Sequence, residues 1–281
     1  TLRQVDGRAP RAWWSWVHTG GVWLMVLLGG NVLLWAVRQS QLQGTAWAAV
    51  ILLVASVVVL LGLAARPLHD PASSWRQRWP LHDFADAYLW RAAAPLAVAV
   101  GLGALLVAVH SDGNARPLPY VPLLNPTDIT VALALVACAL WRARLVQGTL
   151  TVPSAVCNPR WTWVLAGLGF VAFNTVWLRA VHHWAGVRWS AQALFDSFLV
   201  QAGYSILWSL LALGLMLWAV RRAARPVWMG GAGLLGLVVL KLFVVDLSNR
   251  GGSERIVAFI AVGVLMLVVG YFAPLPPATP S

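Results

Sequence analysis

A single lysine inside an apolar segment is the residue of this chain best suited to bind an anion or take part in catalysis. Lys241 is the only lysine among 281 residues, and it interrupts the apolar segment 226–246. A charge in hydrocarbon costs roughly 3 kcal/mol on insertion scales, so such a residue usually has a partner, a water path or a function. Three interpretations are open: the side chain reaches the outer interface, it makes a structural ion pair or hydrogen bond, or it binds a ligand or acts in catalysis.

Other polar residues fall at a similar depth in neighbouring apolar segments. Counted from the expected cytoplasmic helix ends, Asn174 lies about 20 Å deep and Lys241 about 22 Å deep. Gln201 and Ser205 enter the same layer, on a helix face where polar residues recur every four positions, as Ser197, Gln201, Ser205 and Ser209. This stripe either hydrogen-bonds neighbouring helices or faces water. We expect an outward-facing polar pocket formed by Asn174, Gln201, Ser205, Lys241 and Asp246.

The carboxylates nearest to Lys241 are the candidate partners of its ammonium group. Asp246 follows five residues later, about 140° around the helix, and is therefore a poor partner within the same helix. Asp196, at the outer start of another predicted helix, and Glu254, in the last outer loop, are the other candidates. In a binding pocket, Lys241 would supply positive charge for an anionic group, with Asp196 as a further candidate ligand-binding residue.

A second set of candidates falls in the predicted outer loops. Arg179 precedes the adjacent pair His182 and His183 by about one helical turn, and the sequence His110-Ser-Asp112 lies in another outer loop. Such groups could serve an enzyme as acid, base or ligand, and the candidates are Asp112, His182, His183 and Asp196. Adjacent histidines do not share a helix face, and no metal or nucleotide motif is present, so we expect neither a metal nor a cofactor.

The elements that carry these residues are membrane helices. The chain is 60% hydrophobic and 10% charged, whereas ordinary soluble domains are about 45–50% apolar and about 25% charged. Eight apolar segments are long enough to span a bilayer, at 17–37, 44–64, 92–110, 126–142, 161–181, 196–220, 226–246 and 254–273. The sequence predicts an all-α, polytopic transmembrane helical bundle of about eight spans, forming a single domain over residues 1–281.

The distribution of arginine predicts how the helices cross the membrane. With the N-terminus inside, thirteen arginines fall on cytoplasmic flanks and six, Arg179 and Arg255 among them, fall on the opposite side. The positive-inside rule then places the N- and C-termini in the cytoplasm. Because the net charge of +11 is scattered over loops between apolar segments, it indicates membrane orientation and not a nucleic-acid partner.

Two of the predicted loops are long. Loop 65–91, on the cytoplasmic side, contains apolar residues at helical spacing near its end, which predicts a short interfacial helix. Loop 111–125 is proline-rich and is expected to run extended on the outer side. It ends in a helix start, with Asn125 as the N-cap, Pro126 as the first residue and Asp128 as the third, which accounts for Asp128 without chemistry.

Several stretches of the chain after residue 115 resemble a known family. They are Lys241-Leu-Phe-Val-Val-Asp-Leu-Ser248, Arg255-Ile-Val-Ala-Phe259, the pair His182-His183, and the stretches 270–277, 118–126 and 205–208. Over residues 116–277 the chain resembles the bacterial predicted membrane protein family called domain of unknown function 2339. The resemblance implies a location in the bacterial inner membrane and a chain that is the C-terminal part of a longer protein, consistent with its start at Thr1. It marks Lys241, Asp246, Ser248 and Arg255 as motif positions and implies no activity.

These observations predict a non-enzymatic membrane component that binds or moves a solute or an envelope precursor through the pocket around Lys241. One alternative is a membrane enzyme that acts on a lipid-linked or periplasmic substrate. Another is a structural or assembly subunit whose polar groups only fix the packing of its helices. The expected partners are the lipid bilayer, other membrane-protein subunits and an anionic small molecule or lipid-linked precursor, with no nucleic acid.

Overall fold

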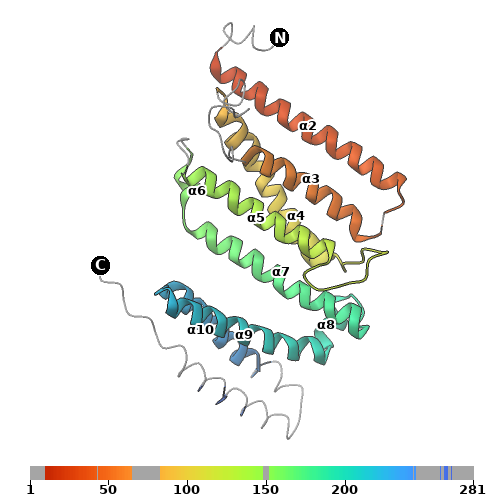
Figure 1. Ribbon diagram of the computed structural model, residues 1–281, viewed down its shortest axis with the longest axis vertical. Helices are drawn as coiled ribbons and strands as arrows, with labels where there is room; N and C mark the ends of the chain where they lie inside the picture. Colours follow the sequence, from red (N-terminus) through yellow and green to blue (C-terminus); the bar gives the residue numbers. More distant parts are fainter. Residues whose placement is uncertain are drawn as a thin grey trace. The chain divides into compact units, whose positions relative to one another are not determined.

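The regular structure of the protein is helical throughout the part that the computed structural model describes. This part comprises residues 10–42, 44–64, 83–147, 152–242 and 244, with the single positions 260, 263, 264 and 267. It contains six helices that are long and apolar enough to cross a membrane. The predicted all-helical, membrane-spanning fold is therefore confirmed. The chain divides into two units, residues 1–185 and 186–281 (Figure 1).

The first unit is built mainly from long apolar helices. They are α2 (Arg11–Gln39), α3 (Ala46–Ala64), α4 (Ala93–His110), α5 (Pro126–Gln147) and α7 (Arg160–Ala185), with the short α6 (Ser154–Cys157). The helices α3, α4 and α5 share a core rich in alanine and β-branched residues, such as Ala97, Val100 and Ala134. Small side chains at these positions let the helix backbones approach closely, which is how membrane helices gain packing energy. Helix α7 packs against α4 and α5.

A π-helical turn, η3 (Ala87–Ala92), leads into α4 without a break. The span that contains it therefore begins at Ala87 and ends at His110. Nearby, Phe84 and Ala87 pack with Trp14 of α2, and the Tyr88 hydroxyl and His18 Nδ1 lie 3.0 Å apart in a hydrogen bond. The interfacial helix predicted within 65–91 stays a prediction, because residues 65–82 lie outside the described part of the chain.

The second unit centres on a helical hairpin. After the short α8 (Ala191–Asp196), helix α9 (Phe198–Arg221) packs along α10 (Arg225–Lys241). A side chain added at Gly231 of α10 would place its Cβ 2.7 Å from Met216 Cγ and 3.0 Å from the Ala212 carbonyl oxygen. Glycine at this position therefore allows the close approach of the two helices. The eighth predicted span, 254–273, lies largely outside the described residues.

Candidate functional site

A fully buried guanidinium lies near the end of α7 in the first unit. Arg179 exposes none of its surface. Its Nη2 lies 2.7 Å and its Nε 3.0 Å from Asp128 Oδ1. Nη1 donates to the main-chain oxygens of Ala108 at 2.8 Å and Ser111 at 3.3 Å, and Nη2 also donates to Thr175 Oγ1 at 3.1 Å. Because a guanidinium carries five N–H donors, these five contacts match its whole hydrogen-bonding capacity.

The position of Arg179 between two helix ends explains why a buried charge is stable here. Ala108 lies in the last turn of α4, where carbonyl groups have no partner within the helix and carry partial negative charge. Asp128 lies in the first turn of α5, where a negative charge is favourable. Arg179, contributed by α7, therefore neutralises the carboxylate and binds the orphan carbonyls at once. It joins the ends of three helices.

The second oxygen of the Asp128 carboxylate binds the loop between α4 and α5. Asp128 Oδ2 accepts from the Tyr120 hydroxyl and from the Leu123 amide, both at 3.1 Å. The same hydroxyl lies 3.1 Å from the Val176 carbonyl, so its single proton is shared between two acceptors. Burial, and then the neighbouring carboxylate, raise the pKa of Tyr120 well above its usual range. Tyr120 therefore stays a neutral donor and ties the loop to α5 and α7.

The start of α5 has the cap that the sequence predicted, but Asp128 has an additional role. Asn125 Oδ1 accepts from the Thr127 amide at 2.9 Å, as an N-cap residue does, and its Nδ2 donates to the Gly113 carbonyl at 3.0 Å. The helix-start pattern alone did not reveal the ion pair of Asp128. Arg179, expected in an outer loop, lies inside α7 and is its partner.

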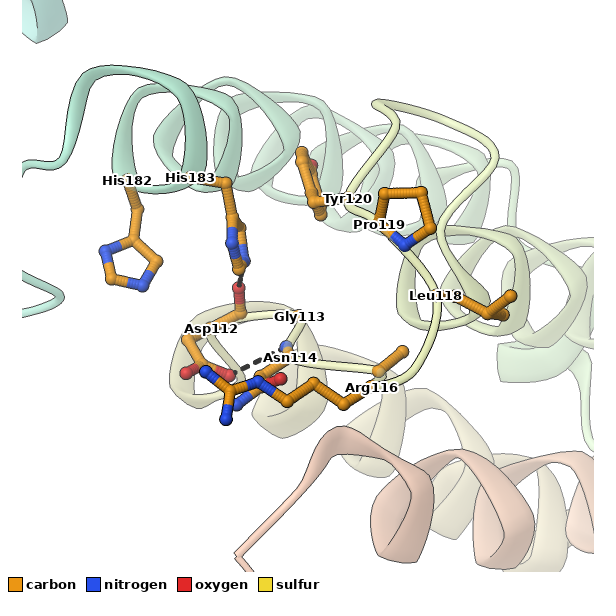
Figure 2. Close-up of a pocket in the computed structure, with 10 residues that line it drawn as sticks. Asp112, Gly113, Asn114, Arg116, Leu118, Pro119, Tyr120, His182 and His183 are labelled. Carbon is orange, nitrogen blue, oxygen red and sulfur yellow. Dashed lines mark hydrogen bonds between the residues drawn. The ribbon is translucent and has the colours of Figure 1, made fainter.

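The two histidines at the end of α7 line a pocket of about 280 Å³ beside the loop (Figure 2). His183 Nε2 lies 2.8 Å from the main-chain oxygen of Asp112. Since a carbonyl oxygen only accepts, Nε2 carries a proton and donates it in this hydrogen bond. The His183 ring stacks on Tyr120 with 4.6 Å between centroids, and Asp112 Oδ1 accepts from the Asn114 amide at 2.9 Å. The pocket thus combines two imidazoles with residues of the loop.

In the second unit, α10 brings Lys241 against α9. Lys241 Nζ donates to the main-chain oxygen of Gln201 at 2.8 Å and to Ser205 Oγ at 3.0 Å. Ser205 Oγ in turn donates to the Gln201 carbonyl at 3.2 Å, and the stripe continues one turn further with Ser209. Both of these acceptors of Lys241 are neutral. Three residues expected in one polar layer therefore lie in direct contact.

The hydrogen bonds described for the other predicted pocket residues are local to their own helices. Asn174 lies in the first unit, where its Nδ2 donates to the Phe170 carbonyl of its own helix at 2.7 Å. Asp196 Oδ2 accepts from Gln192 Nε2 at 2.7 Å, within α8. The motif positions Asp246, Ser248 and Arg255, and the candidate Glu254, lie outside the described residues.

Comparison with known proteins identifies a family but no characterised relative. The family model described as "Predicted membrane protein (DUF2339)" matches residues 1–276. The match therefore also includes the first hundred residues, which lie outside the range 116–277 over which the sequence resembles the family. No curated protein and no solved structure matches the chain. With a match over nearly its whole length, the chain belongs to the predicted membrane protein family of domain of unknown function 2339.

Proposed function

We propose that the protein is a component of the bacterial inner membrane that binds or moves a solute or an envelope precursor by an anionic group held at Lys241. The observation that carries the proposal is the pair of contacts from Lys241 Nζ to the Gln201 carbonyl and the Ser205 hydroxyl. Both contacts are hydrogen bonds from the ammonium group to oxygen atoms that carry no formal charge, and they fix the position of the group on α9. An oriented positive charge between membrane helices attracts an anion far more strongly than the same charge in water.

The same two contacts also suit a purely structural role, in which Lys241 only cross-links α9 and α10. The two roles differ in what depends on the charge. A cross-link depends on hydrogen-bond donors at the end of the side chain, and its loss lowers stability. An anion site depends on positive charge, and its loss lowers binding while the helical hairpin stays folded.

The enzymatic alternative draws on the pocket that His182 and His183 line at the end of α7. There, His183 binds the peptide oxygen of Asp112, while the Asp112 carboxylate accepts from the Asn114 amide. General acid–base catalysis needs such groups within hydrogen-bonding reach of a common reacting atom. The hydrogen bonds at His183 and Asp112 fix the orientation of these two groups on the main chain, as a binding pocket requires.

The proposal is tested by lipid binding to the purified full chain in neutral phosphatidylcholine nanodiscs, with phosphatidylglycerol as the anionic probe. Lys241→Met is expected to weaken binding about tenfold or more, because charge-assisted hydrogen bonds contribute about 1.5–3 kcal/mol each. Lys241→Arg should keep most of the binding. The matched control is Arg188→Gln, which removes one positive charge from an exposed residue of the same unit. Unchanged binding by Lys241→Met, with a lowered unfolding temperature, would assign Lys241 to packing.

A further inference from the structure

The pocket at the end of α7 carries both signs of charge. It lies between the end of α7 and the loop that joins α4 to α5 (Figure 2). Its lining includes Asp112, Gly113, Asn114, Arg116, Tyr120 and His183. Among them, Arg116 is a permanent cation and Asp112 is a carboxylate, so a ligand that complements the pocket carries an anion and a cation together.

The main chain at both charged residues is held in place by hydrogen bonds to other elements. Trp47 Nε1 donates to the Arg116 carbonyl at 2.9 Å, and His183 Nε2 donates to the Asp112 carbonyl at 2.8 Å. Pre-organisation of this kind lowers the entropic cost of binding. Within the described residues, Arg116 and Asp112 do not form an ion pair with each other, so neither charge neutralises the other.

The floor of the pocket rests on the buried network around Arg179. Gly113 lines the pocket and adopts a φ of +78°, and a Cβ at this residue would lie 2.8 Å from Arg179 Cδ. Tyr120, which lines the pocket as well, hydrogen-bonds through its hydroxyl to Asp128. The Arg179–Asp128 ion pair therefore contacts two residues that line the pocket, Gly113 and Tyr120, but is not part of the lining.

The pocket lies at the membrane surface, because its walls are the ends of membrane-spanning helices and the loop between two of them. Trp184, next to His183, is 68% exposed and donates through its Nε1 to the Tyr120 carbonyl at 3.3 Å. Tryptophan is enriched at the headgroup level of bilayers. The loop also exposes Leu123 and Leu124, at 67% and 71%. The charged pocket is thus placed where lipid headgroups are found.

We propose that this pocket binds a phosphate ester that carries an amine, the chemistry of a phosphoethanolamine headgroup. Arg116 would bind the phosphate, which a planar guanidinium recognises with two parallel hydrogen bonds. Asp112, with Oδ1 oriented by the Asn114 amide, would accept from the ammonium group. His183, whose Nε2 proton is held by the Asp112 carbonyl, offers Nδ1 as a second acceptor. This site is independent of the anion site proposed at Lys241, which requires no amine in its ligand.

The test uses the purified full chain in phosphatidylcholine nanodiscs and compares phosphatidylethanolamine with phosphatidylglycerol, which shares the phosphate but lacks the amine. The wild type is expected to bind the ethanolamine lipid about tenfold more tightly. Asp112→Asn should abolish this preference, and Arg116→Gln should weaken the binding of the ethanolamine lipid about tenfold. The matched control is Arg38→Gln in the last turn of α2, an exposed residue of the same unit that does not line the pocket. The unfolding temperature of each variant is measured in parallel.

Competition by soluble phosphoethanolamine separates a soluble ester from a lipid headgroup as the source of this chemistry. Competition by micromolar phosphoethanolamine, lost in both pocket variants, would identify a soluble ester as the ligand, whereas a lipid preference without such competition identifies the headgroup. Equal binding of the two lipids by the wild type overturns the proposal. So does a preference that persists in a folded Asp112→Asn variant. Because phosphatidylglycerol is also the probe of the Lys241 site, the comparison of the two lipids is repeated in the Lys241→Met variant. A preference for the ethanolamine lipid that persists in this variant is independent of Lys241, so the two proposals fail separately.

Discussion

Replacing Arg179 with methionine removes a buried guanidinium and leaves the rest of the helix ends intact. The substitution keeps most of the aliphatic volume of the side chain but deletes five donor contacts. Asp128 then retains the Tyr120 hydroxyl and the Leu123 amide on Oδ2 but loses its counter-charge. The carbonyls of Ala108 and Ser111 lose the donor that Arg179 supplied.

The expected loss of stability on Arg179→Met follows from the burial of the ion pair. The side chains of Arg179 and Asp128 are 1% and 2% exposed, and removing one partner of such a buried pair costs about 3–5 kcal/mol. The pair formed by Arg91 and Asp86 has the same chemistry but is 34% and 39% exposed. Arg91→Gln is therefore the matched control, with an expected loss of about 1 kcal/mol or less.

The assay is unfolding of the purified chain in mixed detergent micelles by increasing fractions of sodium dodecyl sulfate, followed by tryptophan fluorescence. The double variant Arg179→Met with Asp128→Asn should lose less stability than the sum of the two single variants, by about 1–3 kcal/mol. The reasoning is refuted if Arg179→Met is no more destabilising than Arg91→Gln, or if the two single losses simply add.

Further predictions follow from glycines that other atoms approach closely. Gly231→Ala should destabilise the α9–α10 hairpin by about 1–3 kcal/mol, since its Cβ would meet Met216 and the Ala212 carbonyl, whereas Gly236→Ala, with nothing within 4 Å, should be neutral or stabilising. Equal effects in the same detergent unfolding assay would contradict this packing. Gly113→Ala should lower both stability and phosphatidylethanolamine binding, because the positive φ and the Arg179 side chain oppose a Cβ; wild-type binding by the variant would show that the loop adapts.

The membrane fold could be predicted from the sequence because hydrophobic length alone defines a span. The proximity of Lys241 and Ser205 could also be predicted, because a depth estimate and a four-residue polar repeat put both residues in one layer. What depth cannot give is the neighbour relationship between helices. Asn174, at a similar expected depth, donates to the Phe170 carbonyl of its own helix.

The network around Arg179 could not be predicted for a related reason. Asp128 matches the pattern of a helix start, and the sequence predicts Arg179 on the outer flank of its helix, so each residue has a sufficient local explanation. Their pairing depends on α7 packing against α4 and α5, a tertiary contact that no local pattern encodes. In the same way, Gly231 makes a close contact whereas Gly233 and Gly236 do not, because the rotation of the helix and not its composition decides which face meets α9.

The central claim, that the ammonium of Lys241 is an anion-binding group reached by ligands, can be tested with an amine-reactive reagent, because Lys241 is the only lysine of the chain. The reconstituted protein is treated with a membrane-impermeant sulfonated succinimidyl ester, and acylation of the peptide that contains Lys241 is quantified by mass spectrometry. We predict acylation in neutral phosphatidylcholine nanodiscs and a several-fold reduction when phosphatidylglycerol is added. Absence of acylation in folded protein, or acylation that the anionic lipid leaves unchanged, would contradict the claim.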